Sequence, residues 1–200
     1  MRFKVLTLFV YLLLGSNLHA QRWGSLTYTV NVFEVHIVAC DSGAKGEVII
    51  PREIDGLPVT KISWRAFAQI SGITSIKIPD TVTEIEESAF TDCTGLLSAT
   101  IPHTVKTMGS RLFTGCSNLT VVDWPAHLNS IPAQTFNNCK RLKEITLPEG
   151  VTTISESAFG GSGLEKIDLP NTLQTIGSSA FANCEDLKSG WSSIKESNRW

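Results

Sequence analysis

The chain has 200 residues, of which 42% are hydrophobic and only 18% are charged, a balance that is typical of an ordered protein and excludes intrinsic disorder. Lysine and arginine number 17 and aspartate and glutamate 19, so the formal net charge is −2. This mildly acidic balance lacks the basic surface that nucleic-acid binding requires, so we expect no nucleic-acid partner.

Residues 1–20 have the three parts of a secretory signal peptide. A basic start is followed by an apolar run over residues 5–14 and then by a polar stretch that ends at Ala20. The apolar run is too short to cross a bilayer, which takes about 20 residues, and no later segment comes close. We therefore predict cleavage after Ala20, with residues 21–200 secreted or displayed at the cell surface and no transmembrane segment among them.

Residues 21–50 alternate polar and apolar side chains as a pair of strands does. The alternating stretch is LTYTVNVFEVHIVAC, with the expected turn near Asn31, and the polar turn DSGAKG follows it. We predict a β-hairpin that caps the N-terminal end of the stack described next. Trp23 and Trp64 are each isolated in sequence. We expect them in the core of the hairpin or of a loop, so neither indicates a sugar-binding platform.

The remaining sequence, to residue 188, repeats with a period of 23 residues. The shared pattern is F-x-x-C-x-x-L-x-x-I-x-L-P-x-x-V-x-x-I-x-x-x-A, and its phenylalanines are Phe67, Phe90, Phe113, Phe136, Phe159 and Phe181. One such unit buries too little apolar surface to offset the entropy of ordering its backbone, so the units are stable only when stacked. The sequence therefore predicts a repeat solenoid of about six coils over residues 51–188. The first coil holds five extra residues, which predict a loop that bulges around Asp55 to Pro58.

Each unit is expected to contribute one short parallel strand to a single stacked sheet. Alternate positions of L-x-x-I-x-L-P are apolar, and the proline ends the strand because it has no N–H to donate. The predicted inward residues are Ile76, Ile78, Ala99, Ile101, Val122, Trp124, Ile145, Leu147, Ile167 and Leu169. The predicted outer face carries Ser75, Lys77, Ser98, Thr100, Val121, Asp123, Glu144, Thr146, Lys166 and Asp168.

These ten outer residues are the candidate ligand-binding surface, because a rigid row of exposed strands is where repeat solenoids present extended binding surfaces. The alternative is a solvated face without a ligand. The set is polar, mixed in charge and free of aromatic residues, whereas binding hot spots favour Trp, Tyr and Arg. Both interpretations stay open on the sequence.

The last unit starts FANCEDL but continues as KSGWSSIKESNRW, so residues 189–200 form an irregular tail and the C-terminal edge has no obvious cap. Two alternatives are open. In one, Trp191, Ile194 and Trp200 fold back over the edge. In the other, the uncovered edge pairs with another molecule and the protein self-associates.

Four cysteines share one position of the repeat, which Ile70 fills in an earlier coil. They are Cys93, Cys116, Cys139 and Cys184, while Cys40 stands apart. Stacked side chains with parallel Cβ vectors suit a disulfide poorly, so we interpret the position as a slot for small buried thiols. A disulfide or a metal site is the alternative.

No residue pattern supports catalysis. His36, His103 and His127 lie in unlike contexts and are interpreted as surface histidines, since a metal site needs converging ligands. The GGSG stretch after Phe159 lacks the strand-to-helix context and the lysine of a phosphate loop, so we read it as a turn in a shortened coil. We predict a non-enzyme with no cofactor and no metal.

The repeat pattern resembles the leucine-rich repeat of the BspA-like bacterial surface proteins. The leading segment, LTYTVN followed by EVHIVACDSGAKGEVIIPREIDGLPVTKI, is also similar to the one that opens the repeat array in that family, and the resemblance covers roughly residues 25–188. It implies a curved solenoid and a non-catalytic binding module for an extracellular protein or glycan, often in adhesion. The alternative is a structural or self-assembling surface protein with no specific ligand on the sheet face.

Overall fold

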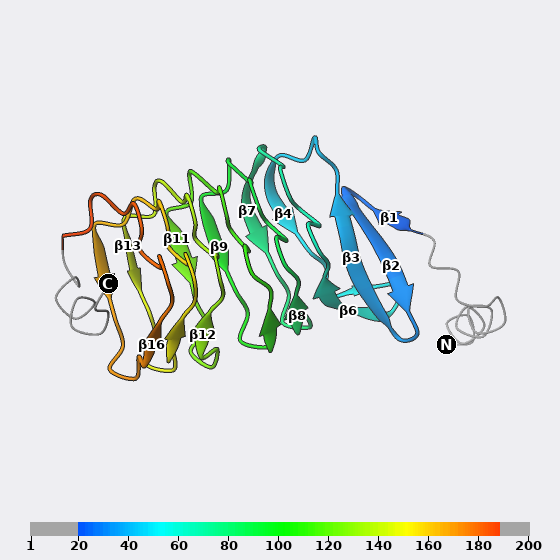
Figure 1. The fold of residues 1–200 in the computed structure, drawn as a ribbon. Coiled ribbons are helices and arrows are strands. Elements are labelled where there is room, and N and C mark those ends of the chain that lie inside the picture. The colour runs from blue at the N-terminus through cyan, green and yellow to red at the C-terminus, as the bar shows by residue number, and fades with distance from the viewer. Residues whose placement is uncertain (1–19, 189–200) are drawn as a thin grey trace.

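A computed structural model describes residues 20–188 as a column of β-coils with a hairpin at its N-terminal end (Figure 1). The predicted signal peptide, apart from Ala20, and the irregular tail with its three apolar residues lie outside the described residues. Within residues 20–188 the regular elements are all strands, and no helix is long and apolar enough to span a membrane. In chain order the strands are β1 (Gln21–Trp23), β2 (Leu26–Asn31), β3 (Glu34–Cys40), β4 (Gly46–Ile49), β5 (Glu53–Ile54), β6 (Leu57–Ile62), β7 (Ile73–Lys77), β8 (Glu84–Ile85), β9 (Ser98–Thr100), β10 (Thr107–Met108), β11 (Val121–Asp123), β12 (Ser130–Ile131), β13 (Glu144–Thr146), β14 (Thr153–Ile154), β15 (Lys166–Asp168) and β16 (Thr175–Ile176).

The coils pair strand on strand in parallel, which confirms the predicted solenoid. The predicted strands form one series, in which β4, β7, β9 and β11 are neighbours and β13 pairs with β15. The structure adds a second series of strands from the V-x-x-I part of each repeat, in which β6, β8 and β10 are neighbours and β12, β14 and β16 are neighbours. All of them have two residues except β6, which has six. Each coil therefore has two straight segments joined by turns.

The predicted inward residues form the core. Ile76, Ala99, Ile101, Trp124, Ile145, Leu147 and Ile167 are buried, while Ile78, Val122 and Leu169 are partly buried and pack against them. Burial of these alternate positions stabilises each coil only through its neighbours, since the preceding coil covers one side of it and the following coil covers the other.

The repeated phenylalanines form a continuous stack along the column. Successive ring centroids from Phe67 to Phe181 lie 5.4, 5.5, 5.8, 5.2 and 5.3 Å apart, in stacked orientation. The first five rings are at most 1% exposed and Phe181 is 7% exposed. We call the segment from three residues before to three residues after each phenylalanine a Phe turn.

Each Phe turn bends through two residues with left-handed backbone. The residue two positions before the phenylalanine and the residue two positions after it have positive φ in all six units, between 51° and 73°. The later position is held by Gln69, Asp92, Gly115, Asn138, Gly161 and Asn183. Gly, Asn and Asp adopt this conformation at least cost, which explains why they recur there. The GGSG stretch supplies Gly161 to this position, so its role in a turn is confirmed.

The N-terminal hairpin consists of β2 and β3, which pair antiparallel around a turn at Val32 and Phe33, next to the predicted position. Strand β3 then pairs in parallel with β6, so the hairpin continues the second strand series and covers that end of the column. Strand β4 already pairs with β7, so the stacked strands start at residue 46, before the expected start of the solenoid at residue 51.

The five extra residues of the first coil form a small hairpin of β5 and β6, at the position of the predicted bulging loop. Its two tip residues, Asp55 and Gly56, are exposed and have φ of 53° and 79°. Positive φ at both central residues is the pattern of the tight turn that joins two antiparallel strands.

The strand ladders are interrupted at the coil that contains Trp124. Within residues 20–188, β11 does not pair with β13 and β10 does not pair with β12. Trp124 occupies a position that other coils fill with Ile or Leu, and its ring packs edge-on against Phe136 with centroids 5.8 Å apart. The larger ring accounts for the interruption, because a packed core accommodates extra volume only by shifting backbone. The column remains continuous through its Phe turns, where Phe113 N donates to Thr135 O at 2.9 Å and Phe136 N to Ala158 O at 2.7 Å.

The shared cysteine position is a buried slot, as predicted. Cys93, Cys116 and Cys139 are at most 1% exposed, Cys184 is half-buried, and all five cysteines of the chain are free thiols. Each slot thiol donates a hydrogen bond to the phenylalanine carbonyl of the preceding coil, from Cys93 to Phe67 (2.9 Å), Cys116 to Phe90 (3.1 Å), Cys139 to Phe113 (3.2 Å) and Cys184 to Phe159 (3.0 Å). The sulfur atoms therefore join neighbouring coils without a covalent bond.

We expect the slot thiols to resist labelling in the folded protein. Burial raises the pKa of Cys93 to about 12 and also raises the pKa of Cys116 and Cys139, and only the thiolate reacts. A disulfide-exchange reagent at pH 8 should leave these three unmodified in native protein and modify all five cysteines within minutes in guanidinium chloride. Mass spectrometry of the digested protein assigns the labels. Fast labelling of Cys116 in native protein would contradict the buried slot.

Candidate binding surface

The ten predicted outer residues lie together on the sheet formed by the first strand series. We call these ten the sheet face. Eight of them are exposed, and Ser75 and Ser98 are half-buried. The strand register aligns them in two rows, because Ser75 pairs with Ser98 and Ser98 with Val121, while Glu144 pairs with Lys166 in the later coils. The structure therefore confirms the outward positions that the sequence alternation predicted for these side chains.

The sheet face extends further than the sequence indicated. Glu47 and Ile49 of β4 are exposed and pair with Ser75 and Lys77, so both rows begin one coil earlier. Leu97, just before β9, is also 45% exposed. The alternation in GEVIIP signalled the first two residues. Nothing in the repeat pattern signalled Leu97, because its position is variable.

The face differs on the two sides of the Trp124 coil. The N-terminal side, from β4 to β11, combines hydroxyl groups with three exposed apolar side chains, Ile49 (55%), Leu97 (45%) and Val121 (61%). It also carries the charged residues Glu47, Lys77 and Asp123, and Lys77 Nζ lies 3.1 Å from Glu47 Oε1. On the C-terminal side the positions are mostly charged, with Glu144, Lys166 and Asp168 among them. An exposed apolar group that covers no core is more informative than an exposed charge, because charge is the ordinary composition of a surface.

The charges of the C-terminal side are largely paired with one another. Lys166 Nζ lies 2.9 Å from Asp168 Oδ2, and Lys143 Nζ lies 2.9 Å from Glu165 Oε1 and 3.7 Å from Asp186 Oδ2. The carboxylate of Asp168 raises the pKa of Lys166, and that of Glu165 raises the pKa of Lys143. Such exposed pairs contribute little to stability, but they satisfy each other and leave the N-terminal side as the better contact surface.

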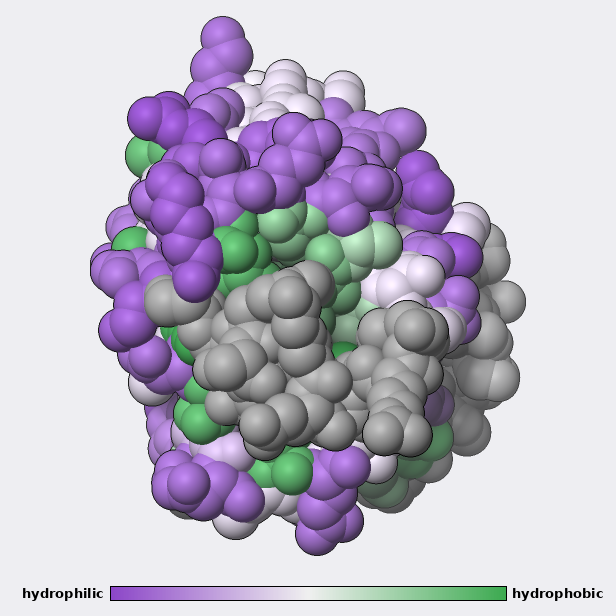
Figure 2. Space-filling model, turned by 60° about the vertical axis from the view of Figure 1, so that its left-hand side comes forward, coloured by the Kyte–Doolittle hydropathy of each residue, from purple (hydrophilic) through white to green (hydrophobic). Residues whose placement is uncertain are grey.

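The C-terminal end of the column shows hydrophobic residues inside a hydrophilic rim (Figure 2). Leu173, Ile176 and Leu187 are only partly buried there, although they pack against the core. Lys188 N donates to Glu165 O at 3.0 Å, the same bond that Glu165 N makes to Lys143 O one coil earlier, at 2.8 Å. The backbone hydrogen bonds between successive coils therefore continue as far as Lys188, the last described residue.

The three histidines of the described residues 20–188 differ in burial. His103 and His127 are exposed, as predicted, whereas His36 is half-buried with its Nε2 2.9 Å from Glu34 Oε1. Hydrogen bonds from His36 and then from Thr60 hold the pKa of Glu34 below its usual value. Among residues 20–188, no group of three or more His, Cys, Asp or Glu side chains is placed to hold a metal ion.

Comparison with known families identifies the repeats. Six copies of the BspA type leucine rich repeat region match over residues 60–188, more than half of the chain. The chain belongs to this family. A comparison with curated proteins finds no match.

Solved structures of bacterial leucine-rich repeat proteins share the fold. A leucine rich cell surface protein from Faecalibacterium prausnitzii is 31% identical, with a TM-score of 0.65 over 85% of this chain and 53% of its own length. The T. pallidum leucine rich repeat protein is 22% identical, with a TM-score of 0.74 over 90% of this chain and 96% of its own. A leucine-rich repeat protein from Eubacterium ventriosum is 20% identical, with a TM-score of 0.67 over 84% and 50%. The chain thus spans about half the length of the F. prausnitzii protein.

Proposed function

We propose that this protein is a non-catalytic binding module that acts outside the cell, in adhesion or protein–protein contact, through the N-terminal side of its sheet face. The observation that carries the proposal is the group of exposed apolar side chains on this side of the sheet face, Ile49, Leu97 and Val121, which cover no core. Membership of a repeat family that includes a cell surface protein of F. prausnitzii supports an extracellular location. The apolar signal-peptide pattern of residues 1–20 supports export.

The fold makes this surface suitable for a macromolecular partner. Its side chains stand on strands locked by parallel pairing, so little conformational entropy is lost when a partner binds. Val121 and Leu97 lie on adjacent coils, joined by a hydrogen bond from Val121 N to Leu97 O of 3.3 Å. The hydroxyls of Ser75, Ser98 and Thr100 flank them as hydrogen-bonding groups. An apolar centre with a polar rim is the usual anatomy of a protein interface.

We expect a charge on the apolar part of the face to abolish partner binding. Val121→Arg introduces a long cation where an interface would exclude water, so affinity should fall at least tenfold, because a charge buried without a partner is strongly unfavourable. The assay uses residues 21–200 to capture extracellular host and microbial components, followed by biosensor titration of the captured partner. Val121 is 61% exposed, so the variant should fold normally.

A matched double variant on the charged side serves as the control. Glu144→Ala with Asp168→Ala removes two exposed carboxylates of the sheet face, on β13 and β15, and should leave the affinity within about twofold, since exposed charges at a rim contribute little to affinity. If neither variant changes binding, the sheet face is excluded as the contact surface. If only the double variant weakens it, the contact lies on the charged side instead.

The second candidate function is a structural, self-assembling protein, and the strand edges of the last described coil favour it. Strands β15 and β16 each have one unpaired edge among the described residues, and such edges are templates for pairing with another chain. Self-assembly predicts a mass that rises with concentration on a sizing column and that changes when residues 189–200 are removed. A mass that is constant and monomeric over a hundredfold range of concentration would exclude it.

A further inference from the structure

Trp64 is a large aromatic side chain that contributes nothing to the core. It is 62% exposed, so the expected placement in a hydrophobic core was wrong, as it was for Trp23, which is 47% exposed. Trp64 opens the first Phe turn, where the other five units have Glu87, Ser110, Ala133, Glu156 and Ser178. The fold tolerates small or charged residues at this position, so it does not require a tryptophan.

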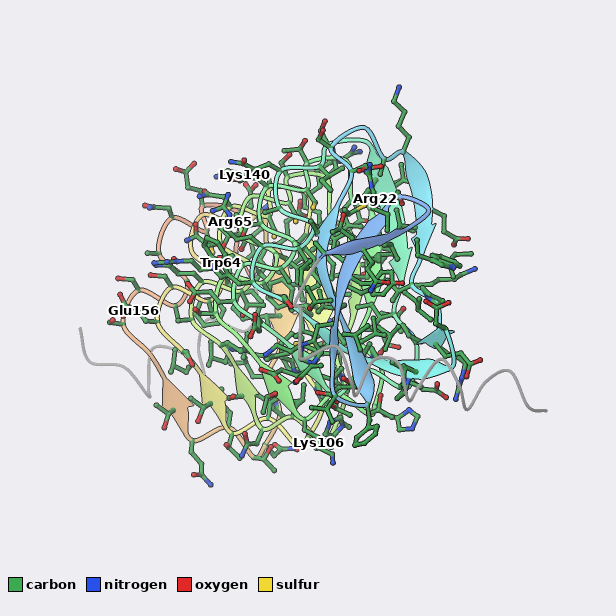
Figure 3. All side chains as sticks on the ribbon, turned by 90° about the vertical axis from the view of Figure 1, so that its right-hand side faces the viewer. Arg22, Trp64, Arg65, Lys106, Lys140 and Glu156 are labelled. Carbon is green, nitrogen blue, oxygen red and sulfur yellow. The ribbon has the colours of Figure 1, made fainter. Side chains whose placement is uncertain are left out.

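The ring is held in place by its neighbours. The guanidinium carbon of Arg65 lies 5.5 Å from the Trp64 ring centroid, in a cation–π contact. The backbone N of Trp64 donates to Glu86 Oε2 at 2.6 Å, and Lys61 Nζ lies 2.5 Å from the other oxygen of Glu86. Figure 3 shows Trp64 and Arg65 together on the outside of the turns, away from Arg22 of the hairpin. Arg65 lies over one face of the ring, and the residue still remains 62% exposed.

A row of planar polar groups continues from the ring along the Phe turns. Arg65 N donates to Glu87 O at 3.3 Å, which places the next turn directly beside the tryptophan. Glu87 Oε1 then lies 3.2 Å from Arg111 Nη1, and Arg111 Nε donates to Gln134 Oε1 at 2.7 Å. The row offers carboxylate, guanidinium and amide groups, each of which can bond two neighbouring hydroxyls.

We propose that Trp64, with Glu87 and Arg111, is a binding site for an uncharged sugar unit of a glycan. A pyranose ring has an apolar face of C–H groups that stacks on the open face of an aromatic ring, and a rim of hydroxyls that bonds planar polar groups. Trp64 supplies the first kind of contact, and the side chains of Glu87 and Arg111 supply the second. This site lies on the Phe turns and is separate from the sheet face.

The composition of the site favours a sugar over a protein partner and an uncharged sugar over an acidic one. Within the described residues, no Phe turn carries another large exposed hydrophobic side chain, whereas protein hot spots lie inside a wider desolvated apolar patch. The three cations around the site are balanced by three carboxylates. Lys61 lies 2.5 Å from Glu86 and 3.2 Å from Glu84, and Arg111 lies 3.2 Å from Glu87, so Arg65 adds the third cation without an excess of positive charge. An acidic sugar would meet as much repulsion as attraction there.

The test is a glycan microarray of neutral and acidic oligosaccharides probed with residues 21–200, followed by titration of the best neutral oligosaccharide. We expect the protein to retain at least one neutral glycan. Trp64→Ala should lower its affinity at least tenfold, and Arg111→Ala about threefold. Trp23→Ala is the matched control, since it removes another exposed tryptophan, and it should leave the affinity within twofold. Circular dichroism confirms that each variant is folded.

Three outcomes would overturn the proposal: no neutral glycan is retained, Trp64→Ala binds as the unmodified chain does, or Trp23→Ala weakens binding equally. Val121→Arg distinguishes this site from the sheet face. It should leave glycan affinity unchanged, so a failure of the sheet-face proposal and a failure of the glycan proposal give different patterns across the same set of variants.

Discussion

Replacing Phe136 with alanine is expected to lower the free energy of unfolding by about 5 kcal/mol. The ring is fully buried and is stacked on Phe113 at 5.8 Å and on Phe159 at 5.2 Å, with Trp124 packed edge-on at 5.8 Å. Truncating a buried Phe to Ala costs about 3–5 kcal/mol, and each aromatic pair adds about 0.5–1.5 kcal/mol. A loss of this size approaches the whole stability of a small domain, about 5–15 kcal/mol. Because the Phe turns continue past Trp124 where the strand ladders are interrupted, the damage should reach coils on both sides.

Phe181→Ala is the matched control for this prediction. Phe181 is 7% exposed and has one stacked neighbour, Phe159 at 5.3 Å, so its truncation removes fewer contacts and should cost about half as much. Urea denaturation followed by circular dichroism measures both variants, with unchanged slopes if the transition remains cooperative. An equal or larger loss for Phe181→Ala would show that the stack is not the central support of the column.

The period of the sequence was sufficient to predict the fold because each coil sees nearly the same surroundings. Phe67 and Phe159 are separated by four units, yet both are stacked and buried. The same argument placed Ile145 inward and Glu144 outward, since side chains alternate along a strand. A repeat solenoid converts a one-dimensional pattern into a three-dimensional one almost directly.

What the pattern did not predict lies where one coil departs from the others. Trp124 satisfied the rule that its position is apolar, but its volume interrupts both strand series, and its indole N–H is buried without a hydrogen-bond partner. The left-handed residues of the Phe turns, Asp92, Asn138 and Asn183 among them, were not predicted, because only the backbone angles identify them. Such details depend on how each side chain packs against its particular neighbours, and a consensus repeat pattern does not contain that information.

The candidate surfaces show the same limit. Alternation identified which residues form the sheet face, but the contrast between its N-terminal and C-terminal sides depends on side-chain pairs such as Lys166 with Asp168. Trp64 was assigned to a core because tryptophan is usually buried at least in part, whereas its turn projects from the column. The sequence therefore predicted which strands and faces the coils form, but not how the charged and aromatic side chains on those faces are paired or exposed.

The folded protein should lose stability steeply above about pH 9 because of its buried thiols. Burial raises the pKa of Cys93 from its ordinary value of 9.0 to about 12, and burial likewise raises the pKa of Cys116 and Cys139. Below about pH 9 both the folded and the unfolded chain keep these protons, so the full stability is present. Above that pH the unfolded chain releases them while the folded chain retains them, and unfolding becomes more favourable. Each thiol that keeps its proton in the folded chain contributes about 1.4 kcal/mol per pH unit, so the three together lower the free energy of unfolding by about 4 kcal/mol per unit above about pH 9. For Cys93 this contribution ends near pH 12, where its folded-state thiol also ionises.

The triple variant Cys93→Ala, Cys116→Ala and Cys139→Ala isolates this effect. Its lysines titrate as in the unmodified chain, so only the thiol contribution disappears and its stability should fall by about 4 kcal/mol less per pH unit above pH 9. Urea denaturation at half-unit steps from pH 8 to pH 11, with a reducing agent present to prevent disulfides, measures both slopes. Equal slopes would mean that the thiols ionise as readily in the folded column as in the unfolded chain. That result is incompatible with sulfur atoms that donate to the phenylalanine carbonyls of the neighbouring coils, since a thiolate has no proton to donate.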